Sequence, residues 1–130
     1  MIVLDEQLKD KHLVAQIAGW YGGHVTHIQT LRPHTIIKDD NIPSLLLTAK
    51  QPTFVTINVK DFWRRMVAHR GYCLVTIDLQ QEDADMISTI LRSLLRLPIF
   101  STRAERMGKV IRVRGVQVQW YGLDRKVVTV

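Results

Sequence analysis

The sequence predicts one α/β domain with a central, mainly parallel sheet and a C-terminal antiparallel β extension. Up to about residue 97, short apolar or β-branched runs alternate with segments of helical periodicity, which is the pattern of strand–helix–strand units. Beyond residue 108 the pattern changes to alternating segments separated by glycine turns. No repeat, low-complexity tract or linker interrupts the 130 residues. We therefore expect a single domain, with its core over about residues 1–100 and a β tail over about residues 109–130.

Each expected strand is a short run bounded by glycine, proline or polar residues. The first run, IVLD, is apolar up to its last residue, which is typical of a buried parallel strand. The second run, HVTHI, alternates and is rich in β-branched residues. In chain order the expected strands are residues 2–5, 24–28, 53–57 and 72–78, followed by two or three antiparallel strands within 109–115, 116–122 and 125–130.

Four segments are expected to form helices. Apolar residues recur at helical spacing over residues 7–19, and glycines end that segment. A second helix starts near residue 39, because two aspartates and an asparagine precede Ile-Pro there, and it ends at Gln51–Pro52. A short helix is expected over residues 62–68. The apolar stripe is clearest over residues 83–97.

The composition predicts a soluble globular protein of the cytoplasm. Hydrophobic residues make up 46% of the chain and charged residues 23%. No apolar run approaches the roughly 20 residues that cross a bilayer, so we expect no membrane segment. The start, MIVLDEQLKDK, carries acids where a signal peptide would be basic. The one cysteine, Cys73, lies inside the run YCLVTI and is expected to be buried and unpaired.

Positive charge is concentrated in the second half of the chain. The net charge is +6. Residues 1–61 contain six Lys/Arg and six Asp/Glu, whereas residues 62–130 contain twelve and six. A basic surface beside a neutral half suits an anionic polymer such as a nucleic acid. Solvated surface arginines explain the same count.

Polar side chains follow two of the expected strands. Asp5 and Glu6 come at the end of the first strand, and the stretch VTINVKDFW places Asn58 and Asp61 after the third. Because the carboxyl ends of parallel strands meet at one edge of a sheet, we expect these side chains to converge there. The sequence thus indicates a ligand site at this edge.

Asp39 and Asp40 are expected at the same edge, because a helix that returns the chain to a parallel strand begins there. Crowded carboxylates repel one another unless a cation lies between them. Mg²⁺ prefers oxygen ligands and retains waters, and it can activate a water for attack on phosphorus. These acids are therefore candidates for a metal-dependent phosphodiesterase site.

Each of these residues also has a purely structural interpretation. Asp5, like the two aspartates near residue 40, could cap a helix, and Asn58 with Asp61 could form an Asx turn. Lys60 could contact a phosphate or be a solvated turn residue. The sequence leaves these alternatives open.

Three motifs in this order resemble the PIN-like domain family of small bacterial proteins. This family is related to the PIN-domain ribonucleases that act as toxins in toxin–antitoxin pairs. Its first strand reads much like ILLDENL, which IVLDEQL matches, and a later strand reads much like LVTxDxDF, which FVTINVKDF matches approximately. Acidic residues near position 40 lie between the two. The resemblance covers roughly residues 1–100.

The resemblance implies a three-layer α/β/α fold and a ribonuclease that uses Mg²⁺ or Mn²⁺. Asp5, Asp40 and Asp61 correspond to the family's metal-binding acids, with Glu6 and Asp39 as possible additional acids. Asn58 would orient a water or a ligand. The expected RNA-binding residues are Lys60, Arg64 and Arg65. A small antitoxin protein is the implied partner, and the β tail offers an edge strand for a homodimer.

The match to the family is incomplete at Asn58. The family usually has an aspartate there, so the amide removes one negative charge, and the spacing to Asp61 is one residue longer than in the commonest motif. An alternative function is therefore a catalytically degenerate module that binds RNA or a partner protein without turnover. A phospho-receiver-like domain is a third hypothesis, and it is weaker because its phosphoacceptor aspartate would be Asn58.

Overall fold

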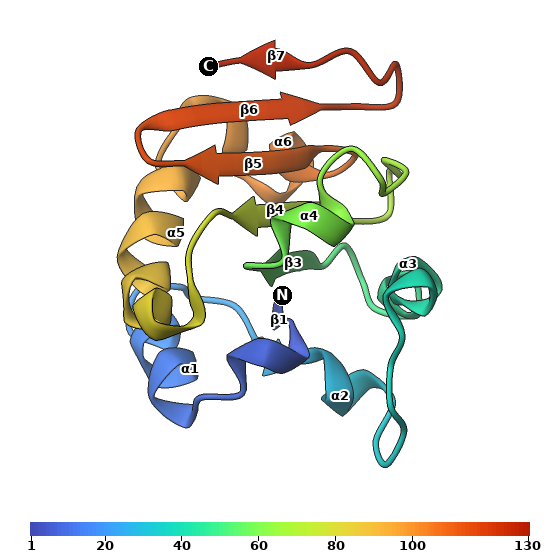
Figure 1. Cartoon of the computed structure of the whole chain (residues 1–130), viewed down its shortest axis with the longest axis vertical. Helices are drawn as coiled ribbons and strands as arrows, with labels where there is room; N and C mark the ends of the chain where they lie inside the picture. The colour runs from blue at the N-terminus through green and yellow to red at the C-terminus, as the bar shows by residue number, and fades with distance from the viewer.

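A computed structural model describes all 130 residues, which form a seven-stranded sheet with helices on both faces (Figure 1). The strand order is β2-β1-β3-β4-β5-β6-β7. The strands are β1 Ile2–Leu4, β2 Val25–His27, β3 Thr53–Thr56, β4 Cys73–Ile77, β5 Val110–Arg114, β6 Gln117–Tyr121 and β7 Val128–Thr129. The first four pairings are parallel and the last two antiparallel. The expected α/β class with a mainly parallel sheet is confirmed.

The helices divide between the two faces of the sheet. Residues of α1 (Lys11–Ala18) and α5 (Ile87–Leu95) contribute to one core cluster. Residues of α2 (Ile28–Leu31), α3 (Ile42–Leu46) and α4 (Val59–Phe62) contribute to the other. The remaining helical segments are α6 (Arg103–Arg106) and the 3₁₀ turns η1 (Glu6–Leu8), η2 (Asp39–Asn41), η3 (Gln81–Met86) and η4 (Pro98–Phe100).

The central strands are buried on both faces, which explains their nearly continuous apolar sequences. In β1, Ile2 and Leu4 belong to the core under α1 and α5, whereas Val3 belongs to the opposite core. β4 follows the same alternation, with Leu74 and Cys73 on opposite faces. Cys73 is unpaired and fully buried, as expected, and burial raises the pKa of its thiol to about 12.

Several helix boundaries differ from the predicted ones. The helix expected over residues 7–19 is divided, because the Asp10 side chain accepts a hydrogen bond from the His12 N–H and starts α1 only at residue 11. The helix expected over residues 62–68 lies earlier, at Val59–Phe62. Asn58 caps its start, and Arg64, with a left-handed φ of 67°, follows its end.

The predicted β tail is not separate from the core. β5 pairs in parallel with β4, with Val110 opposite Leu74, and the Val110 side chain has no exposed surface. The pairing is parallel because α5 and α6 carry the chain across the sheet between these strands. Only β6 and β7 are antiparallel, and Gly115, with a φ of 58°, makes the tight turn into β6.

The helix α2, the turn η4 and the helix α6 have four residues or fewer and were not predicted. Segments this short carry too few apolar positions for a helical period to be recognised. None of the helices has the length and apolar character that crossing a membrane requires.

The core on the α1 and α5 face can be tested by truncating Leu91, which is fully buried. We expect Leu91→Ala to lower the free energy of unfolding by about 2–5 kcal/mol, because it removes apolar contacts and leaves a cavity. Urea denaturation followed by circular dichroism measures the change. Met86→Ala is the control, since Met86 is 49% exposed and should change stability little. Equal effects of the two substitutions would contradict this packing.

Candidate functional site

The site is built on the parallel pairing of β1 with β3. Leu4 lies opposite Val55, and the Asp5 N–H donates to the Val55 carbonyl at 3.0 Å, so Asp5 emerges beside Thr56. β1 also pairs with β2 on its other side. The connection from β1 to β2 and the connection from β3 to β4 pass over opposite faces. This is a topological switch point, where open α/β sheets usually bind ligands.

Asp5 is a buried carboxylate with two hydrogen-bond donors. Its side chain is 5% exposed. The Thr56 hydroxyl donates to Oδ2 at 2.6 Å, and the Glu6 backbone N–H donates to Oδ1 at 2.7 Å. Burial raises the pKa of Asp5, the two hydrogen bonds oppose that rise, and the negative charges of Asp39 and Glu6 add to it. Asp5 is thus held in one orientation at an energetic cost.

Asn58 and Asp61 form a reciprocal pair at the end of β3. The Asn58 side-chain amide donates to Asp61 Oδ2 at 2.8 Å, and the Asp61 backbone N–H donates to Asn58 Oδ1 at 3.3 Å. The Asn58 backbone N–H also donates to the Thr56 hydroxyl at 3.0 Å. The hydrogen bonds therefore run from Asp5 through Thr56 to the Asn58–Asp61 pair. Asn58 caps a helix and positions a carboxylate at the same time.

Asp39, in η2, faces the other acids. Burial raises the pKa of Asp39, and the negative charges of Asp61, Asp40 and Glu6, with hydrogen bonding to Asp61, raise it further. Asp40 is exposed and acts on Asp39 through its charge. Of the two aspartates near residue 40, Asp39 is the one whose charge also acts on Asp5.

A pocket of about 540 Å³ opens over these acids. It is lined by Asp39, Asp40, Pro43, Asp61, Arg65, Met66 and Val67. Arg65 is thus the one expected RNA-binding residue that shares the pocket with acids. Lys60 is exposed and forms no hydrogen bond or ion pair.

Arg64 turns towards the C-terminal strands. Its guanidinium lies 5.4 Å from the centre of the Tyr121 ring, and Nη1 donates to the Arg125 carbonyl at 3.3 Å.

Glu6 forms hydrogen bonds with neighbouring segments of the chain. Its Oε1 accepts from the Gln29 side chain at 3.3 Å and from the Ile37 N–H at 3.4 Å.

The acids fit a divalent cation in chemical type but not in spacing. Carboxylate and amide oxygens are the donors that Mg²⁺ and Mn²⁺ prefer. No three side chains among His, Cys, Asp and Glu close around a common point that a metal ion could occupy. The negative charges of Asp61, Asp40 and Glu6 contribute to the raised pKa of Asp39, so these carboxylates are near enough to repel one another.

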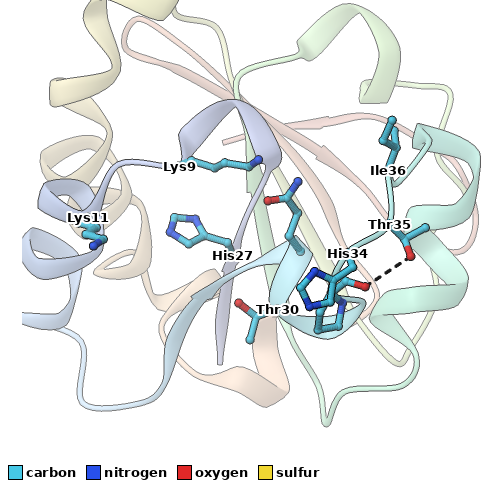
Figure 2. A pocket seen from close by; sticks show the side chains of 9 residues that line it. Lys9, Lys11, His27, Thr30, His34, Thr35 and Ile36 are labelled. Carbon is cyan, nitrogen blue, oxygen red and sulfur yellow. Dashed lines mark hydrogen bonds between the residues drawn. The ribbon is translucent and has the colours of Figure 1, made fainter.

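A second pocket, of about 690 Å³, lies beside Glu6 and is rich in basic residues (Figure 2). It is lined by Lys9, Lys11, His27, Gln29, Thr30, Pro33, His34, Thr35 and Ile36, without any acid. Gln29 links it to the acids through Glu6. Burial, and then the charge of Lys9, lower the pKa of His27, whose Nδ1 atom is enclosed and has no hydrogen-bond partner.

The sequence analysis did not identify this basic pocket. Its residues come from the turn before α1 and the first residue of α1, from the end of β2, from α2, and from the polar connection that follows α2. The available signal was Lys9 and Lys11 in the first expected helix, His27 in the second expected strand and His34 in the connection after it. Such a pocket is suited to a phosphate group next to the acids.

No family model, curated protein or solved structure matches this chain.

The repulsion among the acids predicts an unusual pH dependence of stability. The raised pKa means that Asp39 holds its proton more tightly in the folded chain than in the unfolded one. Above its ordinary pKa of about 4, stability should therefore fall as pH rises through the folded value. We expect Asp39→Asn to raise Tm relative to the unmodified protein at pH 7.5 and to have no effect below pH 4.

Thermal melts from pH 3.5 to pH 8 measure this difference. Asp85→Asn is the matched control, because Asp85 is exposed and lies in η3, away from the acids. A loss of stability in Asp39→Asn at neutral pH would show that Asp39 is held by favourable contacts rather than crowded by its neighbours.

Proposed function

We propose that this protein is a metal-dependent ribonuclease of PIN-like type that hydrolyses RNA phosphodiester bonds at the carboxyl edge of its sheet. The observation that supports this proposal is the crowding of Asp5, Asp39 and Asp61, which come from three separate segments of the chain. Such crowding raises the energy of the protein alone and is relieved by a divalent cation. The adjacent basic pocket offers a place for the RNA backbone.

In this proposal Asp5, Asp39 and Asp61 would hold Mg²⁺ or Mn²⁺, and Asp40 lines the same pocket as Asp39 and Asp61. A divalent ion bound there would supply polarisation of a phosphoryl oxygen and a water of lowered pKa. Thr56 fixes the orientation of Asp5, and the Asn58 amide fixes that of Asp61. Arg65, inside the acidic pocket, contacts a phosphate oxygen of the substrate.

The proposal extends to a partner. By the resemblance of IVLDEQL and FVTINVKDF to the PIN-like family, the protein is the toxin of a toxin–antitoxin pair, and a small antitoxin protein inhibits it. The outer strand β7 and the exposed valines around it, Val127, Val128 and Val130, offer an edge for that partner or for a second copy of the chain.

A second candidate function is a module that binds RNA or a protein without turnover. Two observations favour it. Asn58 contributes a neutral amide where a fourth acid would complete the cluster, and no three acids close around one point. This alternative predicts binding that weakens steeply with salt, without dependence on a metal.

Cleavage of a labelled structured RNA distinguishes the two functions. The assay is run with Mg²⁺, with Mn²⁺ and with EDTA. We expect cleavage that needs the metal and that falls by about 100-fold or more in Asp5→Asn and in Asp61→Asn, because each substitution removes an anionic ligand. Asp85→Asn should retain full activity. Binding without cleavage by the folded protein would establish the non-catalytic alternative.

Substitution of Asn58 tests the metal site without relying on turnover. We expect Asn58→Asp to lower Tm in EDTA, because it places a second carboxylate against Asp61 in place of a hydrogen-bond donor. The same variant should bind Mg²⁺ about tenfold more tightly, because the charge of the ligand set increases. Titration of Mg²⁺ followed by calorimetry and thermal melts measures both effects.

Asn58→Ala is the control for this experiment, since it removes the amide without adding charge. It should lose about 1 kcal/mol of stability with the helix cap and gain no affinity for Mg²⁺. If Mg²⁺ fails to restore the stability of Asn58→Asp, the acids do not form a metal site.

A further inference from the structure

Arg106, in α6, is a buried cation without an acidic partner. Its side chain is 4% exposed. Nε donates to the Thr53 hydroxyl at 3.1 Å, and Nη1 donates to the Phe100 carbonyl at 3.0 Å. The one ion pair in the structure joins Arg114 to Asp78, so no carboxylate neutralises Arg106. A buried charge of this kind is costly unless an anion accompanies it.

Two further arginines share a pocket with Arg106. The pocket has a volume of about 300 Å³ and is lined by Trp20, Tyr21, Arg92, Leu95, Arg96, Ser101 and Arg106. Arg92 and Arg96 are four residues apart in sequence, at the C-terminal end of α5, and therefore project from the same side of the helix. The lining contains three guanidinium groups and no acid.

Arg106 retains hydrogen-bonding capacity on the pocket side. A guanidinium has five N–H groups, and the bonds to Thr53 and Phe100 use two of them. The Nη2 atom forms no hydrogen bond and is not among the polar atoms sealed from solvent. An oxyanion in the pocket could accept from Nη2 while the other two nitrogens keep their protein partners.

The aromatic wall of the pocket is held in place. The Trp20 indole N–H donates to the Ser88 hydroxyl at 2.9 Å, and Trp20 packs edge-on against Tyr21. A Cβ atom at Gly23 would lie 2.7 Å from the Tyr21 ring, so a larger residue there would require the ring to shift. The pocket is therefore preformed on this side.

We propose that this pocket binds a phosphoryl group, either inorganic phosphate or the phosphate of a nucleotide. Three guanidinium groups match the charge of a phosphate dianion, and the planar fork of arginine pairs with two of its oxygens. The site lies at the start of β3, where Thr53 is the first residue, whereas the acids follow the end of that strand. It is thus separate from the proposed catalytic site and does not depend on it.

Binding is tested in EDTA, so that no metal can act at the acids. The probes are inorganic phosphate, adenosine 5′-monophosphate and a glutamate-rich peptide, at matched ionic strength. We expect phosphate or the nucleotide to raise Tm and to shift the NMR signals of the Trp20 indole and of Ser101. Arg96→Gln should weaken the binding by about tenfold.

Arg70→Gln is the matched control, because Arg70 is exposed and lines no pocket. It should bind the probes as the unmodified protein does. Arg92→Gln provides a second exposed variant, so that the result does not depend on altering the buried Arg106. A response to the nucleotide alone identifies a phosphomonoester as the ligand, and a response to both identifies the phosphoryl group itself.

Three results would overturn the proposal. One is the absence of any response to phosphate and to the nucleotide. Another is an equal response in Arg96→Gln, Arg70→Gln and the unmodified protein, which would indicate non-specific screening of charge. The third is a response to the acidic peptide alone, which would assign the pocket to a carboxylate-bearing protein partner.

Discussion

The register between β1 and β3 is the constraint on which the candidate site depends. With Leu4 opposite Val55, the residue that follows β1 is Asp5, and its carboxylate accepts a hydrogen bond from the Thr56 hydroxyl. A shift of one residue would reverse the faces of the strand and remove the donor from a buried carboxylate. The apolar packing on both faces therefore determines the register, and through it the position of the acids.

Several charged side chains of this molecule are placed where they lower its stability. Asp5 and Asp39 are crowded by like charges, and Arg106 is buried without an acid. Some of the lysines and arginines in the second half of the chain are also less available for binding an anion than their number suggests. Lys109 and Arg112 lie over the rings of Trp120 and Trp63, respectively. Charges that remain unpaired at such a cost are characteristic of binding sites rather than of a purely structural core.

The sequence was sufficient for the strands and for the edge at which the acids gather. Long apolar runs and the order of elements determine both. The sequence did not predict the features that depend on local hydrogen bonds or on the burial of a single side chain. Asn58 was expected to be either a turn residue or part of a site, and in the structure its side chain caps α4 and donates a hydrogen bond to Asp61. Arg106 looked like any other arginine, because nothing in its neighbours RAERMG distinguishes a buried cation from an exposed one. Membership of the PIN-like family stays a prediction.

The left-handed backbone of Arg64 has a mechanical consequence. A non-glycine residue with a φ of 67° stores strain of about 1–3 kcal/mol, which the contacts of its side chain with Tyr121 and Arg125 hold in place. Arg64 lies three residues beyond Asp61, so its contacts with Tyr121 and Arg125 connect the C-terminal strands to the segment that carries Asp61. The C-terminal strands therefore brace the segment that follows Asp61, although they lie at the far end of the sequence.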